Sequence, residues 1–471
     1  MMRVFKNILS FILLCCIQCN YTIYSQEKYV KKNSQKDRFI EVDIRKKAGQ
    51  YDAFHNTCVS TGRAYLLLRK DHQEHIQKAA QECGFKYLRF HGLFQDDMGL
   101  YRENAAGEAI YSWQYIDNVY DFIYDTGLHP FVVFDFMPEA LASEKKYIYW
   151  EHSNITPPKD YKKWGNLIYE TVKHFTERYG QEEVSQWFFE VWNEPDKNFF
   201  TGTIDNYLEM YEYAAQAVKS VSENYRIGGP SIAGNNYWIS RLIEYCNKKD
   251  IPLDFISAHN YSAKTFSEEK TYKTWEVPSI PSWEPGPSWP LGNLCYDPHG
   301  TTEAIENVYR TVQSSLIPTL DIHYTEWGLS WDYWDPIRDS YQAPSFILSR
   351  INSIANDRIK SLSYCMVSDV FEEDGPPTDY FHGGFGLINL QGLRKPAYFA
   401  YKFLNELGNT KLECSDKNTI ACCSGNDSIQ IIFWDCTVRQ DKENKAYYAQ
   451  STPALSAGTA KVSFSGLTPG M

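Results

Sequence analysis

The segment WFFEVWNEP, residues 187–195, gives the clearest indication of the fold. Its first six residues are apolar or aromatic except Glu190, which is typical of a parallel strand that is buried on both faces. Pro195 cannot donate to a strand ladder, so the strand is predicted to stop with Glu194 at its carboxyl end. Functional side chains gather at that end of a parallel barrel, so Glu194 is a candidate site residue.

Strand-like and helix-like runs alternate along most of the chain. We predict strands at 51–60, 86–90, 130–138, 187–194, 226–230, 253–258, 319–325 and 361–368, and helices at 71–83, 113–126, 159–179, 204–224, 238–248, 301–316, 343–357 and 395–407. Eight strands interleaved with helices have one common arrangement, a closed barrel. The sequence therefore predicts an α/β fold, a (β/α)8 TIM barrel over residues 51–408.

Short alternating runs flank this predicted barrel. The segment 38–45, RFIEVDIR, lies ahead of it, and the runs 410–414, 428–434, 445–450 and 460–464 follow Gly408. We interpret residues 409–471 as a small accessory β-sandwich domain, to which the N-terminal segment 26–50 contributes a strand. The turn-like GLTPGM at the end predicts that a further strand follows in the native chain, so the domain is expected to be truncated.

The charge balance limits the expected partners. The 471 residues carry a net charge of −12, whereas nucleic acids and anionic membrane surfaces attract basic clusters. We therefore expect no nucleic-acid partner. The cysteines after residue 25 are scattered without C-x-x-C spacing, so no zinc site is expected. The oligomeric state stays open.

The N-terminus has the pattern of an export signal. Arg3 and Lys6 precede an apolar run at 8–17, and Ser25 is a small residue suited to cleavage. The run is too short to span a bilayer, so we expect a signal peptide at 1–25, no transmembrane span, and a periplasmic or extracellular protein. Lipid anchoring through Cys15, Cys16 or Cys19 is the less favoured alternative.

A second carboxylate is predicted beside Glu194. Glu326 follows the strand at 319–325, so both glutamates should face one cavity at the barrel mouth. Glycoside hydrolysis needs such a pair, because one acid protonates the leaving oxygen and one carboxylate attacks the sugar. Glu139 and Asp369 also follow predicted strands and could compete for these roles, but no motif assigns them one.

Several motifs, in unbroken order from residue 38 to about 408, resemble the β-xylosidases of glycoside hydrolase family 39. They are RFHGLFQDDMGLYRE (89–103), FMPEALAS (136–143), FEVWNEP (189–195), GGPSIAG (228–234), HYTEW (323–327), SDVFEE (368–373) and FHGGFGLINLQGLRKPAYFAYKFLNELG (381–408). Each motif alone is moderately specific, and the series is highly specific.

The resemblance implies a retaining exo-glycosidase that releases β-D-xylose from xylo-oligosaccharides or related glycosides, with no metal and no organic cofactor. Glu194 would be the acid/base and Glu326 the nucleophile. The other residues implied are Asn193 on the sugar 2-hydroxyl, His91 on a neighbouring hydroxyl, Tyr261 orienting Glu326, and His259 and Glu372 lining the same subsite.

One departure leaves the sugar identity open. The family usually has Tyr-Trp ahead of Ser-Asp on the eighth strand, and this chain has Cys365 in the place of the Trp, so the aromatic platform beneath the sugar is expected to be absent. An α-L-iduronidase, α-L-arabinofuranosidase or β-galactosidase activity is therefore an alternative, and a non-catalytic carbohydrate-binding protein is a third. An enzyme acting on iduronate would need basic groups around the sugar carboxylate.

Overall fold

The computed structural model describes residues 37–265, 294–355, 357–377, 379–425, 428–436 and 458–467. The predicted signal peptide, its three cysteines, and the predicted strand at 445–450 lie outside these described residues. None of the described helices has the length and apolarity needed to cross a bilayer.

Eight parallel strands close into a barrel, as predicted. Neighbours in the barrel follow chain order, and the last strand pairs with the first. The strands are β2 (Cys58–Arg63), β3 (Tyr87–His91), β6 (His129–Phe134), β9 (Phe188–Val191), β10 (Arg226–Ile232), β11 (Phe255–Tyr261), β14 (Asp321–Gly328) and β15 (Ser361–Cys365). Their carboxyl ends therefore meet at one mouth, which positions the site.

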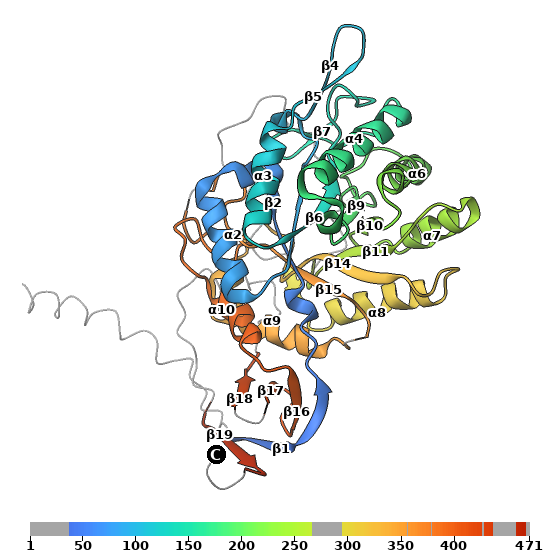
Figure 1. Ribbon diagram of the computed structural model, residues 1–471. Helices are drawn as coiled ribbons and strands as arrows, with labels where there is room; N and C mark the ends of the chain where they lie inside the picture. The colour runs from blue at the N-terminus through green and yellow to red at the C-terminus, as the bar shows by residue number, and fades with distance from the viewer. Residues whose placement is uncertain are drawn as a thin grey trace, which may run out of the picture.

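Helices form the outer layer of the barrel (Figure 1). They are α2 (Lys70–Cys83), α3 (Gln114–Asp125), α4 (Tyr161–Tyr179), α5 (Gln181–Val184), α6 (Ile204–Val221), α7 (Tyr237–Lys249), α8 (Gly300–Gln313), α9 (Gln342–Ser353) and α10 (Pro396–Asn405). Local signals set their ends: Asp160 caps α4, Thr203 and Asn206 form a capping box on α6, and Gly84 ends α2 in the left-handed region with φ 71°.

Several predicted strand boundaries are wrong, and the third barrel strand, for example, ends at Phe134 instead of residue 138. The first barrel strand starts at Cys58 instead of residue 51, because the 3₁₀ turn η1 (Phe54–Asn56) occupies the preceding segment. The strand before Glu194 ends at Val191, since Trp192 and Glu194 have φ angles of 69° and 43° and turn the chain out of the strand. The eighth strand ends at Cys365 instead of residue 368.

Small elements at the carboxyl ends of the strands were not predicted. They are the strand pairs β4 (Tyr101–Glu103) with β5 (Ala109–Tyr111), β7 (Tyr147–Ile148) with β8 (Ser153–Asn154), and β12 (Ala263–Thr265) with β13 (Leu294–Tyr296), and the 3₁₀ turns η2 (Ala64–Leu68), η3 (Asp96–Met98) and η4 (Pro336–Asp339). Such two- and three-residue strands are too short to give a periodic signal. The β4–β5 hairpin projects at the top of Figure 1.

The accessory region is one five-stranded sheet in the order β18-β17-β16-β1-β19. Its strands are β1 (Arg38–Gln50), β16 (Thr410–Cys414), β17 (Thr419–Ser424), β18 (Ser428–Phe433) and β19 (Ala460–Ser465). The predicted contribution of the N-terminal strand is confirmed, because β1 pairs with β16 and β19. The second layer of the predicted sandwich is not found among the described residues. Figure 1 places this sheet beneath α9 and α10.

Candidate active site

Glu194 is held in a tight turn beyond β9. Its backbone N–H donates to the Ser231 carbonyl at 3.0 Å, which ties the turn to the end of β10. The Glu194 carboxyl shares a hydrogen bond of 2.8 Å with His259 Nδ1. Burial raises the pKa of Glu194, and the negative charge of Glu326 adds to this rise, although the His259 contact opposes it. The arrangement favours a carboxyl group that keeps its proton.

Glu326 lies on β14 and has the opposite electrostatic environment. Arg89 Nη1 donates to Glu326 Oε1 at 2.7 Å, and Tyr261 Oη donates to Oε2 at 2.8 Å. Burial alone would raise the pKa of Glu326, but the charges of His259 and Arg89 lower it below its ordinary value. Both oxygens are therefore held by donors, and the group stays an ionised carboxylate.

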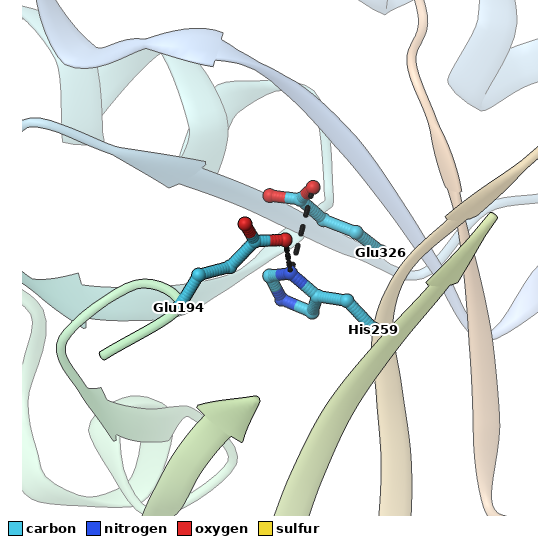
Figure 2. A group of neighbouring side chains, drawn as sticks. All are labelled: Glu194, His259 and Glu326. Carbon is cyan, nitrogen blue, oxygen red and sulfur yellow. Dashed lines mark hydrogen bonds and ion pairs between the residues drawn. The ribbon is translucent and has the colours of Figure 1, made fainter. Parts of the chain in front are cut away.

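His259, at the carboxyl end of β11, contacts both glutamates through one ring nitrogen (Figure 2). Its Nδ1 atom is 2.8 Å from Glu194 Oε1 and 3.6 Å from Glu326 Oε2. Its Nε2 atom faces Ser231 Oγ at 2.9 Å and Thr325 Oγ1 at 3.1 Å, so the ring is fixed from both sides. The imidazole therefore contacts both carboxyl groups from a fixed position.

The distance between the carboxyl groups of Glu194 and Glu326 distinguishes a retaining from an inverting glycosidase. One oxygen of Glu194 and one of Glu326 lie within 4.8 Å of each other and of a His259 nitrogen. Two carboxyl groups about 5 to 5.5 Å apart suit a retaining glycosidase, while inverting pairs need about 6.5 to 9.5 Å. Two carboxylates and an imidazole could also coordinate a metal ion. Both Glu326 oxygens, however, already accept hydrogen bonds from Arg89 and Tyr261.

A buried ion pair beneath the glutamates was not predicted as part of the site. Arg89 on β3 and Glu190 on β9 are fully enclosed, and Arg89 Nε donates to Glu190 Oε2 at 2.8 Å. Arg89 also donates to Asn193 Oδ1 at 2.9 Å, so the amide oxygen of Asn193 is bound within the protein. The sequence does indicate this pair, because each of two apolar strands contains one charged residue and buried charges are rare unless they are paired.

His91 ends β3 and is also buried. Its Nε2 atom lies 2.7 Å from Glu373 Oε1, and Tyr333 Oη donates to Glu373 Oε2 at 3.0 Å. Burial alone would lower the pKa of His91, but Glu373 raises it to about 9. His91 is thus an imidazolium donor at neutral pH.

Glu372 and Glu373 have different partners in the structure. Glu372 pairs with Arg69 at 2.6 Å, and Glu373 contacts His91. The two glutamates are adjacent in a loop after β15, where periodicity gives no sign of which one faces inward.

Cys365, at the end of β15, is buried in a cluster of apolar and aromatic side chains. Met366 and Phe385 are buried with it, and Tyr261, Tyr333 and Phe371 pack against them. The Tyr261 and Phe385 rings stand edge to face with centroids 6.4 Å apart. Aromatic surface is therefore present around the thiol, although residue 365 itself supplies none.

Comparisons with known proteins identify relatives of this chain. The model of the family "Glycosyl hydrolases family 39" matches residues 38–278 and 296–456. A β-xylosidase of Geobacillus stearothermophilus is 37% identical over 391 residues, which are 81% of this chain and 74% of the relative. The crystal structure of a monomeric β-xylosidase from Caulobacter crescentus CB15 is similar with a TM-score of 0.82 and 32% identity, over 92% of this chain and 84% of the other.

A more distant relative is the human α-L-iduronidase, which is 24% identical over 202 residues, or 40% of this chain and 29% of the relative. The family model covers most of the chain, and the β-xylosidase match extends over four fifths of it. The chain therefore belongs to glycosyl hydrolase family 39.

Proposed function

We propose that this protein is a retaining exo-β-xylosidase that removes terminal β-D-xylosyl residues from xylo-oligosaccharides or related glycosides. The observation that carries the proposal is the pair Glu194 and Glu326, whose carboxyl groups share one enclosed site and have pKa values shifted in opposite directions. A glycosidase needs this contrast, because one carboxyl must hold a proton while the other stays ionised.

Glu194 is the proposed general acid and base. Burial raises the pKa of Glu194 and so favours its protonated form, which can protonate the glycosidic oxygen as the bond to the leaving group breaks. In the second half of the reaction the same carboxylate takes a proton from the attacking water. The His259 contact at 2.8 Å holds the carboxyl in place for both steps.

Glu326 is the proposed nucleophile. Its ionised carboxylate attacks the anomeric carbon and forms a glycosyl ester, which water then hydrolyses with net retention of configuration. Arg89 and Tyr261 orient the carboxylate and keep it unprotonated. The proximity of the two glutamates leaves little room for a water on the Glu326 side of the sugar, which supports this route over inversion.

The remaining polar groups are proposed to bind the sugar. Asn193 donates to the 2-hydroxyl through its amide nitrogen, and His91 donates to a neighbouring hydroxyl. His259 and Glu372 are proposed to line the same subsite, and Glu373 holds His91 there. Each of these side chains is oriented by a second protein contact, as a preorganised site requires.

The charges at the site favour a neutral sugar over a uronic acid. The buried arginines Arg63 and Arg89 are both neutralised by protein carboxylates, Arg63 by Asp97 and Arg89 by Glu190 and Glu326. The His91 imidazolium is likewise paired, with Glu373. A sugar carboxylate placed here would meet several negative groups and few uncommitted positive ones. This argues against the iduronidase alternative.

A substrate panel tests the proposal. Purified protein is incubated with aryl β-xyloside, aryl β-galactoside, aryl α-arabinofuranoside and aryl α-iduronide, and release of the aryl group is followed. We expect the β-xyloside to be turned over with the highest kcat/KM. A preference for any of the other three, or no turnover beyond that of a Glu194→Ala, Glu326→Ala double variant, contradicts the proposal.

We also propose that the protein is exported through cleavage of the segment 1–25, on the strength of the basic and apolar pattern of the N-terminus. The intact mass of the protein recovered from outside the cytoplasm tests this. The expected mass lacks the leader. A mass that retains the leader, or one that carries a lipid on a cysteine, contradicts it.

A further inference from the structure

Two acidic loops meet beside His91, apart from the contacts that hold Glu194 and Glu326. One loop lies between β7 and β8 and carries Glu151, and the other follows β15 and carries Glu373. The backbone N–H of Trp150 donates to the Glu373 carbonyl at 2.8 Å and so joins the two loops.

The backbone around Glu151 is in an uncommon conformation. Tyr149 and His152, which flank the Trp150–Glu151 pair, both have left-handed φ angles, of 65° and 60°. Residues with side chains rarely adopt this region, and such conformations gather at functional sites. The conformation directs the Glu151 side chain inward, where only 4% of it is exposed.

The buried Glu151 carboxyl is incompletely partnered. Its Oε1 atom accepts from Ser153 Oγ at 3.2 Å and lies 3.9 Å from Arg63 Nε, while Arg63 also pairs with Asp97. Its Oε2 atom has no hydrogen-bond partner among the described residues. A buried carboxylate with a single distant cation is costly to maintain, which points to a role beyond packing.

Glu151 and Glu373 influence each other electrostatically. Burial and the Glu373 charge raise the pKa of Glu151 to about 7, against the opposing charges of Arg63 and His91. The groups that face Glu151 are Arg63 at the end of β2, with Asp97 of η3 behind it, His91 at the end of β3, and Glu373 and Tyr333 on the loops after β15 and β14. Glu151 therefore changes charge within the neutral pH range while Glu373 stays committed to His91.

We propose that Glu151 is a positioning residue that acts through Glu373 on His91, so that the sugar affinity of the site depends on whether Glu151 is protonated. The inference rests on the proposed function, in which His91 binds a sugar hydroxyl. Protonated Glu151 lets the two loops approach, and Glu373 holds His91. Ionised Glu151 repels Glu373 across a buried space, and this loosens the joined loops and misplaces His91.

The test compares Glu151→Gln with wild type between pH 5.5 and 8.5. Glutamine has the shape of the protonated acid and cannot ionise. In wild type, KM for an aryl β-xyloside should rise roughly fivefold as pH passes through 7, the order expected for adding one charge near another. In Glu151→Gln, KM should stay near the low-pH wild-type value throughout. The matched control is Glu144→Gln, which removes an exposed carboxylate ahead of the same loop and should behave as wild type.

A second measurement separates binding from catalysis. The Kd of D-xylose, measured by calorimetry at pH 5.5 and 8.5, should weaken with pH in wild type and in Glu144→Gln but not in Glu151→Gln. Turnover of the xyloside by wild type tests the proposed function by itself. An active Glu151→Gln variant that keeps the wild-type pH dependence contradicts the inference alone, as does an increase of KM by the same factor at every pH, which indicates a merely structural role.

Discussion

The guanidinium of Arg89 donates to the Glu326 carboxylate at 2.7 Å from within a strand, and the arginine is almost wholly buried. Arg89 is also bound to Glu190 and Asn193. One cation therefore sets the charge state of the proposed nucleophile and the orientation of the amide next to the proposed acid. The chemistry of the site depends on a residue from β3, which is three strands away from β14, the strand of Glu326.

Arg89→Lys should impair the enzyme strongly. Lysine cannot reproduce the planar set of donors that contacts Glu190, Glu326 and Asn193 at once. We expect kcat to fall by about 10²-fold. Because Arg89 lowers the pKa of Glu326, its loss should raise that pKa, and the acidic limb of the kcat/KM profile should move to higher pH. The exposed Arg102→Lys is the control, and an unmoved acidic limb in Arg89→Lys would count against this account.

The same contact makes stability depend on pH. The folded-state pKa of Glu326 lies below its unfolded value, so its stabilising contribution is fully present above the unfolded pKa, near 4.3, and is lost as pH falls through the folded pKa. Glu326→Gln should therefore destabilise the protein more at pH 7 than at acidic pH. Urea unfolding of both proteins at several pH values measures this, and an equal difference at every pH would contradict it.

His259→Asn should shift the basic limb of the activity profile. Hydrogen bonding to His259 lowers the pKa of Glu194, so removing the imidazole should raise that pKa further and keep the acid protonated to higher pH. We expect kcat to fall by about tenfold or more, because the carboxyl loses its orienting contact. The buried His323, which bonds to Ser361, offers His323→Asn as a control. A basic limb that moves to lower pH in His259→Asn would be the opposite of the expected sign.

Cys365→Trp should destabilise the protein instead of supplying a platform for the sugar. The thiol is buried against Met366 and Phe385, with the ring of Tyr261 beside it. Inserting an indole into such packing costs about 1 to 3 kcal/mol, and it displaces the side chain that orients Glu326. Thermal unfolding and KM for the xyloside measure the effect. A variant with unchanged melting temperature and a lower KM would show that space for the indole exists.

Azide should separate the roles of the two glutamates. Glu326→Ala removes the group that forms the ester, so turnover should fall by roughly 10⁴-fold or more, and azide should enter from the vacated face to give a glycosyl azide of inverted configuration. Glu194→Ala should retain ester formation from aryl xylosides with good leaving groups, and azide should then give the retained product. Product configurations exchanged between the two variants, read by NMR, would reverse the assignment.

The sequence predicted the barrel well because its strands carry apolar runs at regular spacing. It also predicted that Glu194 and Glu326 share one cavity, since the carboxyl ends of parallel strands meet by geometry alone. Strand ends were less predictable. The turn at Trp192 and Glu194 depends on the Glu194 N–H bonding to Ser231, a contact from a distant part of the chain.

Other features of the site depend on contacts that a linear pattern does not encode. Glu373 contacts His91 while Glu372 pairs with Arg69. This difference depends on the orientation of a loop, and loops have no periodicity from which it could be predicted. The inward side chain of Glu151 depends on the left-handed backbone of Tyr149 and His152. Neither residue is glycine, so the sequence gives no indication of this conformation. Arg89 was visible as a charge inside an apolar strand, but its partners Glu190 and Glu326 come from two other strands.

Trapping of the covalent intermediate tests directly whether Glu326 is the nucleophile. A 2-deoxy-2-fluoro-β-xyloside with a good leaving group slows both steps but leaves the ester long-lived, and peptide mass spectrometry then locates the sugar. We expect one fluoroxylosyl group per protein, bound to Glu326. A label on Glu194, or inhibition without any covalent adduct while the unmodified xyloside is still turned over, would contradict it.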